Sequence, residues 1–189
     1  NQTIEICANF GEGSGGAAAG GDPRYLSAGS SLVEYSLLRG TGGGGQEWGS
    51  YLWAHSGRPP SLSVNLGANG QGGLTRAVNA KMSTNQPDAG SGLHTSTFSG
   101  NHALIDYGYA SSFACSASPS SRATQVPFMA QVNNAASCTL AATAMNFGTV
   151  TTITAARDAT STITVTCTKG TNYTLGLSNG SGGGTGPTQ

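Results

Sequence analysis

The sequence has few charged residues, since Asp, Glu, Lys and Arg make up only 8% of its 189 residues. Its eight basic and eight acidic side chains cancel, so no basic surface is available to neutralise phosphates. We therefore expect no nucleic-acid partner. Long hydrophobic runs are lacking as well, because none approaches the ~20 residues that span a bilayer as a helix. We expect no membrane insertion.

The charged helix-forming residues Glu, Lys and Arg are scarce, whereas glycine accounts for 30 residues. The apolar residues alternate with polar ones, which is typical of β-strands with one buried face. The alternating stretches are residues 4–10, 62–66, 126–132, 163–167 and 173–177, and shorter apolar runs cover 32–38, 77–82 and 104–109. Glycine clusters and prolines separate them. This pattern predicts an all-β fold of immunoglobulin-like, Greek-key β-sandwich modules.

A dinucleotide-binding turn is not expected, although Gly11, Gly13 and Gly16 form a G-x-G-x-x-G motif. Such a turn needs a following helix whose N-terminus meets the pyrophosphate. Residues 17–23, Ala-Ala-Ala-Gly-Gly-Asp-Pro, cannot form that helix. We predict a flexible loop between strands and no cofactor.

Catalytic and metal-binding arrangements are also lacking. His55, His94 and His102 are scattered, and no serine occupies a G-x-S-x-G turn. Asp106 lies in a predicted strand, where we expect it to face solvent or a sheet edge. We predict no catalytic residue, no metal site and no enzymatic activity. A secreted enzyme on a jelly-roll scaffold is a less favoured alternative.

The four cysteines predict two disulfides in an oxidising compartment, because no C-x-x-C pair favours zinc. Three connectivities are open. Proximity in the sequence favours Cys138–Cys167, which leaves Cys7–Cys115. Closing the loop between Cys138 and Cys167 should stabilise the fold by about 3.5 kcal/mol.

A cluster of large apolar residues, namely Trp48, Tyr51, Leu52 and Trp53, lies between glycines. One interpretation is that Trp48 and Leu52 cap the sandwich core. The other is an exposed adhesive loop that contacts surfaces or partners.

Several motifs resemble the spore coat protein U domain, the module of archaic (Csu-type) chaperone–usher pilus subunits. The resemblance in the second half rests on Cys138-Thr-Leu-Ala-Ala-Thr-Ala-Met-Asn-Phe-Gly148 and on residues 158–170, followed by Asn172-Tyr-Thr-Leu. The matching motifs in the first half are Arg24-Tyr-Leu, Glu34-Tyr35, Trp48-Gly49 and residues 94–109, with Tyr107-Gly-Tyr109.

The order of these motifs implies a domain division. Residues 1–109 resemble the later part of a first module, residues 110–123 a linker, and residues 124–189 the opening part of a second module. Three arrangements fit this order: a fragment of a longer two-domain subunit, halves completed by partner chains, or a permuted single module.

One further stretch, in which Val126, Phe128, Ala130 and Val132 alternate, has two interpretations. It is either the first strand of its own module or, as the resemblance implies, a strand donated to another subunit. Pro127 interrupts the run and cannot donate to a ladder, so we expect an edge position or a bulge there.

The resemblance implies a structural subunit of an extracellular bacterial pilus or surface fibre that is secreted through the periplasm and supports attachment or biofilm formation. Donor-strand complementation would join the subunits. The implied partners are other copies or related pilus subunits, a periplasmic chaperone and an outer-membrane usher. The alternative function is a tip adhesin or a carbohydrate-binding β-sandwich.

Overall fold

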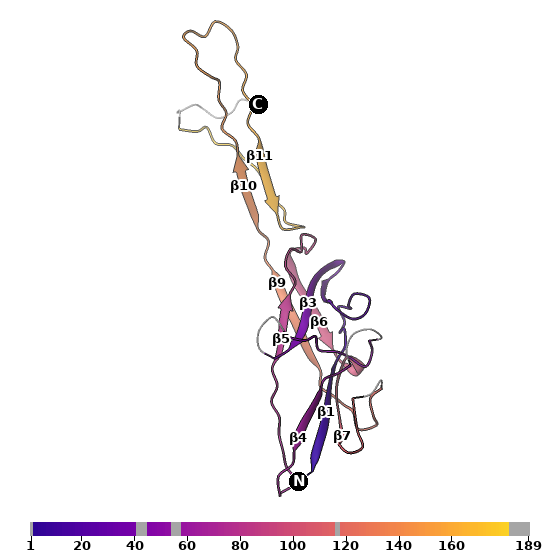
Figure 1. Ribbon diagram of the computed structural model, residues 1–189. Helices are drawn as coiled ribbons and strands as arrows, with labels where there is room; N and C mark the ends of the chain where they lie inside the picture. The colour runs from indigo at the N-terminus through magenta and orange to yellow at the C-terminus, as the bar shows by residue number, and fades with distance from the viewer. Residues whose placement is uncertain (1, 41–44, 54–57, 116–117, 182–189) are drawn as a thin grey trace. The chain divides into compact units, whose positions relative to one another are not determined.

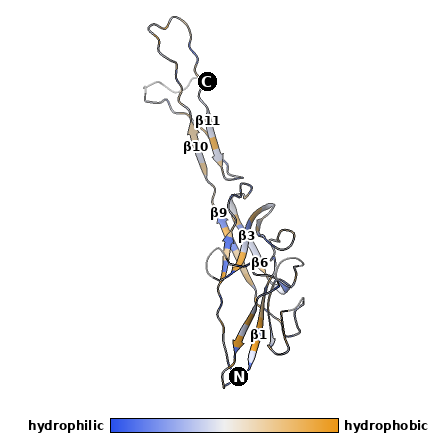
Figure 2. Ribbon diagram, in the orientation of Figure 1, coloured by the Kyte–Doolittle hydropathy of each residue, from blue (hydrophilic) through white to orange (hydrophobic). Residues whose placement is uncertain are grey.

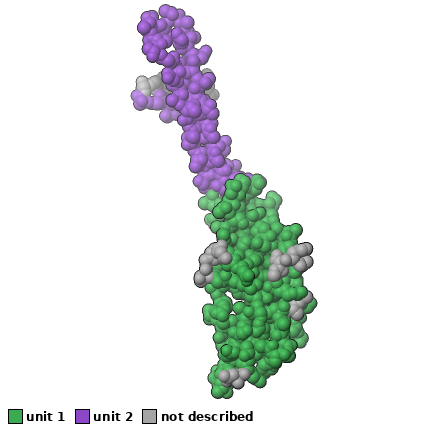
Figure 3. Space-filling model, in the orientation of Figure 1, with its two compact units in different colours: residues 1–135 green, residues 136–189 purple. Residues whose placement is uncertain are grey.

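The computed structural model describes residues 2–40, 45–53, 58–115 and 118–181. The chain divides into two compact units, Asn1–Ala135 (unit 1) and Ala136–Gln189 (unit 2) (Figure 3). Strands and one short 3-10 helix are the regular elements of the described residues (Figure 1). The predicted all-β fold is confirmed. No helix within the described ranges has the length and apolar character needed to cross a membrane.

Unit 1 holds ten of the elements and unit 2 the remaining two. In unit 1 they are β1 (Thr3–Phe10), β2 (Arg24–Ala28), β3 (Ser31–Arg39), β4 (Ser61–Asn65), β5 (Val78–Met82), β6 (Gly92–Phe98), η1 (Gly100–His102), β7 (Ala103–Tyr109), β8 (Thr124–Gln125) and β9 (Phe128–Asn134). In unit 2 they are β10 (Cys138–Ala142) and β11 (Ile163–Cys167).

The strands of unit 1 form two antiparallel sheets. Sheet I has the order β4-β1-β7-β8, and sheet II has the order β5-β3-β2-β6-β9. Apolar side chains from both sheets share one core, as expected for a β-sandwich. The buried members of this core are Ala8, Leu26, Val33, Tyr35, Leu37, Trp48, Phe98 and Ala103.

The chain crosses between the two sheets at two neighbouring places, once after β6 and once after β8. β6 in sheet II leads through η1 into β7 in sheet I. β8 pairs with β7, and β9 then pairs with β6, both antiparallel. Pro127 lies between β8 and β9, where the chain changes sheets and no ladder hydrogen bond is required of it. The strands on both sides of Pro127, β8 and β9, lie at sheet edges, which agrees with the expected edge position.

The glycine loop after β1 is closely packed rather than loose. The Gly11 amide donates to the carbonyl oxygen of His102 (3.0 Å), and the Ser14 amide donates to that of Thr97 (2.9 Å). A Cβ atom on Gly15 would lie 1.8 Å from the carbonyl oxygen of Tyr25. The prediction of a flexible loop was wrong, because glycine here permits the backbone to lie directly against β2.

Asp106 is buried, with an exposed fraction of 1%, so the expectation that it faces solvent or an edge was wrong. Its carboxylate accepts hydrogen bonds from the amide of Ser120 (2.6 Å) and from the Ser120 hydroxyl. The neighbouring position of β1, Cys7, forms a disulfide with Cys115. The segment of residues 110–123 is thus fastened back onto sheet I at two points.

The predicted strand of residues 173–177 is absent, because the structure assigns no strand to this part of unit 2. Its apolar side chains, Tyr173, Leu175 and Leu177, are all exposed. Alternation favours an extended strand only where a neighbouring strand and a core are present, and the described part of unit 2 offers neither for these residues.

Candidate functional site

The strand β9 closes one edge of sheet II in unit 1. It pairs with β6 from Phe98↔Phe128 to Gly92↔Asn134. Its side chains alternate between half-buried and exposed, as the sequence predicted. Phe128, Ala130 and Val132 all pack against the core. We call β9 the closing strand.

Phe128 anchors the closing strand in the core. Its ring stacks on Phe98 with the ring centroids 4.3 Å apart, and it meets Phe10 edge-on at 5.2 Å. Val126, which precedes the change of sheets, is more exposed but donates its amide to the carbonyl oxygen of Ala103 (3.0 Å). Val126 thus lies beside β7 of sheet I and outside the core, whereas the other three candidate residues belong to sheet II.

The far end of the closing strand is held by a side chain that the sequence analysis missed. Asn134 donates its side-chain amide to the carbonyl oxygens of Ala89 (3.1 Å) and Gly90 (2.8 Å). No sequence signal distinguishes this asparagine from the others. The closing strand is therefore fixed by an aromatic ring at one end and by hydrogen bonds at the other.

The closing strand belongs to the first compact unit, whose boundary falls after Ala135. The sequence analysis instead began the second module at residue 124. Within this chain, residues 128–134 pair with β6, and the two strands of the disulfide hairpin pair with each other. The division into a later part of one module and an opening part of another stays a prediction.

In the described part of unit 2, the strands β10 and β11 form an antiparallel ribbon. One face of the ribbon is apolar, with the pairs Leu140↔Val165 and Ala142↔Ile163 next to the Cys138–Cys167 disulfide. The opposite face carries Thr139↔Thr166 and Ala141↔Thr164. Figure 2 shows the hydrophobic colouring on these strands.

The apolar face of this ribbon has no layer packed against it in the described part of unit 2. Leu140 is 64% exposed. The other large exposed apolar side chains of unit 2 are Met145, Phe147, Val150, Ile153, Ile163, Tyr173, Leu175 and Leu177. A two-stranded ribbon is marginally stable by itself, so unit 2 has the character of an unfinished sandwich.

Both disulfides have the pairing that proximity in the sequence favoured. Cys138–Cys167 joins the two strands of unit 2 at a directly paired position. Cys7–Cys115 joins β1 to the segment of residues 110–123 in unit 1. The covalent links thus lie within the units and not between them.

Trp48 is a core residue. It is 3% exposed, and its indole nitrogen donates to the carbonyl oxygen of Ala8 (2.7 Å). Its ring lies 5.1 Å from that of Phe10. The core interpretation is correct for Trp48, which is not accessible as an adhesive contact.

The other members of the aromatic cluster differ from Trp48. Leu52 is 48% exposed and does not cap the core. Tyr51 and Trp53 are half-buried, and the guanidinium of Arg24 lies 4.3 Å from the Trp53 ring centroid. Residues 54–57, which include His55, lie outside the described residues.

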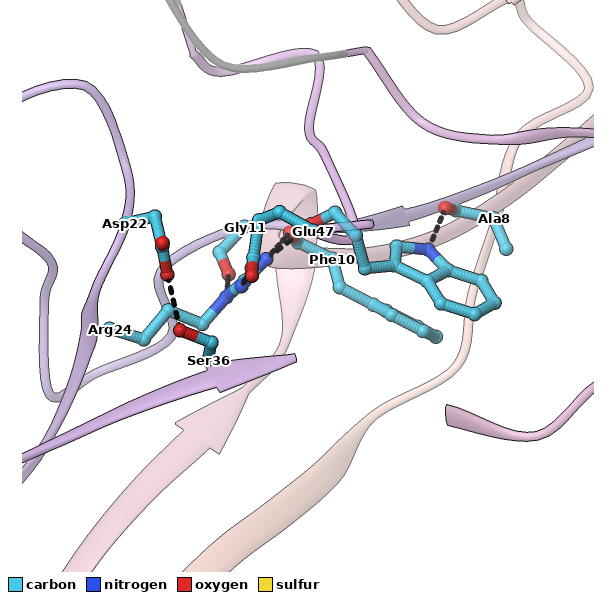
Figure 4. A network of polar contacts seen from close by, with 8 residues as sticks. Ala8, Phe10, Gly11, Asp22, Arg24, Ser36 and Glu47 are labelled. Atoms are coloured by element: carbon cyan, nitrogen blue, oxygen red, sulfur yellow. Dashed lines mark hydrogen bonds and ion pairs between the residues drawn. The ribbon is translucent and has the colours of Figure 1, made fainter. Parts of the chain in front are cut away.

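A buried arginine organises this corner of unit 1 (Figure 4). Arg24 is fully buried and donates to the carbonyl oxygens of Gly11, Phe10 and Trp48, each at 2.7 Å. It also forms an ion pair with Glu47. Burial raises the pKa of Glu47 to about 7, and Arg24 acts against this rise. The sequence analysis identified Arg24 only as part of a family motif and missed this role.

His94 and His102, the two histidines among the described residues, both have hydrogen-bond partners. His94 is buried, and its Nε2 lies 2.9 Å from the Ser31 hydroxyl. His102 accepts a hydrogen bond at Nδ1 from the amide of Gly13 (3.3 Å). Within the described ranges, no three His, Cys, Asp or Glu side chains cluster as metal ligands would.

The structure thus defines an all-β protein with a closed sandwich and an unfinished disulfide ribbon. Residues 124–189 match the family of the Spore Coat Protein U domain, so the resemblance is confirmed for this part of the chain. This domain is associated with chaperone–usher pilus subunits. No curated protein and no solved structure matches the sequence.

Proposed function

We propose that the protein is a structural subunit of an extracellular bacterial pilus or surface fibre assembled by strand complementation, which supports attachment or biofilm formation. The family match supports the general class. Its partners would be other copies or related pilus subunits. A periplasmic chaperone and an outer-membrane usher would deliver it to the cell surface.

The observation that carries the proposal is the closing strand. A strand that lies at the edge of sheet II forms a seven-residue ladder with β6. It also contributes alternate apolar side chains to the core. This is how a donated strand binds, since main-chain hydrogen bonds provide affinity and alternate side chains fill pockets. In this chain the acceptor edge is occupied in cis, and in a fibre the same edge would accept a strand from a neighbour.

An added peptide that takes the place of the closing strand tests the proposal. In the full chain, Phe128→Asp with Val132→Asp should displace the closing strand, because two carboxylates cannot be buried in the apolar core. A fluorescent peptide of residues 124–134 should then bind the variant, as measured by fluorescence anisotropy, and should raise its melting temperature.

The matched control is the same peptide with Phe128 and Val132 replaced by Asp, which should not bind. Failure of the native peptide to bind a variant that retains its β-sheet circular dichroism would contradict strand complementation. The unchanged protein, whose edge is already occupied, should take up the peptide only slowly.

A further inference from the structure

Two links hold the segment of residues 110–123, which lies between β7 and β8, against sheet I. Cys115 forms a disulfide with Cys7, a fully buried residue of β1. The amide and the hydroxyl of Ser120 donate to the carboxylate of Asp106 on β7. Cys7 and Asp106 are directly paired in the β1–β7 ladder, so both links reach the same place on the sheet. We call these two links together the clasp.

The backbone of β7 is shaped to receive the same segment. Gly108 lies two residues beyond Asp106 and therefore on the same face of the strand. A Cβ atom on Gly108 would lie 2.6 Å from Cβ of Phe113 and 2.9 Å from Nη2 of Arg122. The Arg122 guanidinium in turn lies 5.8 Å from the Phe113 ring centroid. The missing side chain at Gly108 thus lets the segment lie directly on β7.

The clasp shortens the free chain that leads to the closing strand. β7 ends at Tyr109 and β8 begins at Thr124, so the connection between them covers 15 positions (124 − 109). Because Ser120 is bound to β7, only 4 positions (124 − 120) remain free before β8. If the Ser120 contact alone is open, the chain is free back to Cys115, over 9 positions (124 − 115).

The length of this tether sets how readily a detached strand returns to its own edge. The effective concentration of a tethered group falls roughly as the −3/2 power of the tether length. A tether of 4 positions instead of 15 therefore raises the effective concentration of residues 124–134 at their own edge about sevenfold. Opening the Ser120 contact alone should lower it about threefold.

We infer that the clasp is a conformational device that keeps the closing strand on its own chain, so that the strand exchanges between copies mainly when the clasp is open. The significance for assembly rests on the proposed function, because only a subunit that exchanges strands needs its own strand to detach. The retention of residues 124–134 is a property of the single chain and can be measured without any partner.

Hydrogen–deuterium exchange of the full chain, followed by mass spectrometry, tests the inference, because amide exchange reports the population of the locally opened state. Asp106→Ala removes both acceptors of Ser120 and should speed the exchange of residues 124–134 about threefold. Asp106→Ala combined with Cys7→Ala and Cys115→Ala opens the whole clasp and should speed it about sevenfold. The β2–β3 ladder, which contains neither link, should keep its exchange rates.

Two matched controls accompany these variants. Cys138→Ala with Cys167→Ala removes the other disulfide and should leave the exchange of residues 124–134 unchanged, since both cysteines belong to unit 2. If the Asp106 variants fail to fold, Ser120→Ala is compared with Ser121→Ala, its exposed neighbour. Ser120→Ala should speed exchange by up to about threefold and Ser121→Ala should not.

Three results would overturn the inference: unchanged exchange of residues 124–134 in the variant with the open clasp, an equal rise in the β2–β3 ladder, or equal exchange in Ser120→Ala and Ser121→Ala. An equal rise would show that the links stabilise unit 1 as a whole rather than retain the strand.

The peptide experiment separates this inference from the proposed function. If the peptide of residues 124–134 binds the displaced-strand variant while opening the clasp leaves exchange unchanged, the clasp is wrong and the fibre proposal stands. If the peptide fails to bind while opening the clasp speeds the exchange of residues 124–134, strand complementation is wrong and the clasp stands.

Discussion

At the scale of single residues, Arg24 shows how a buried charge is accommodated in a core that has few charged residues. Its guanidinium donates to three backbone carbonyl groups, those of Phe10, Gly11 and Trp48, and it balances the carboxylate of Glu47. The network joins the end of β1 to β2 and to the segment that carries Trp48. A buried charge is tolerated here because the guanidinium is hydrogen-bonded to three carbonyl oxygens and paired with a carboxylate.

We predict that Arg24→Met destabilises unit 1 by about 3–5 kcal/mol, because the Glu47 carboxylate and three carbonyl oxygens lose their donor. Chemical denaturation followed by tryptophan fluorescence measures this change. The control is Arg76→Met, which removes an exposed arginine and should change the unfolding free energy by less than about 0.5 kcal/mol. Equal effects of the two substitutions would contradict the role assigned to Arg24.

At the scale of elements, the closing strand has one face that packs in the core and one face that is exposed to solvent. The side that carries Phe128 packs in the core, whereas Met129 on the other side is 56% exposed. We predict that Phe128→Ala lowers the unfolding free energy by about 2–3 kcal/mol, because the stacked and edge-on ring contacts are lost.

Met129→Ala is the matched control for this prediction, and it should cost less than about 0.5 kcal/mol. Thermal unfolding by differential scanning calorimetry compares the two. A larger effect of Met129→Ala would show that the strand lies in the opposite register, since a shift by one residue exchanges the faces of a strand.

The comparison of sequence with structure also belongs to the scale of elements. Alternation located β1, β4, β9 and β11, because a period of two fixes which side chains share a face. It failed for residues 173–177, since alternation does not say whether a neighbouring strand exists. The edge to which residues 128–134 pair could not be predicted either, because strand pairing depends on contacts distant in the sequence.

The burial and the partners of the polar residues Asp106 and Arg24 could not be predicted from the sequence either. Asp106 was expected to lie near solvent because a lone carboxylate in a strand is normally exposed. Its partner, Ser120, comes from residues 110–123, which the sequence pattern indicated as a linker. Arg24 is a similar case, since its acceptors are backbone oxygens, which leave no mark on the sequence.

At the scale of the whole molecule, the chain contains a unit with a closed core and a unit with almost none. Unit 1 gains its last strand from the segment just before unit 2, which is the segment where the family match begins. Among the described residues of unit 2, the apolar side chains of the ribbon, such as Leu140, are exposed. A protein with this distribution of apolar surface is suited to association with further copies.

The most direct test of the central claim, that an edge strand from one copy completes the sandwich of another, is the gel mobility of native protein before and after boiling. The account predicts a ladder of non-covalent polymers in the unboiled sample that collapses to one band on boiling. The variant with Phe128→Asp and Val132→Asp should lose the ladder. A single monomer band in unboiled native material would contradict the claim.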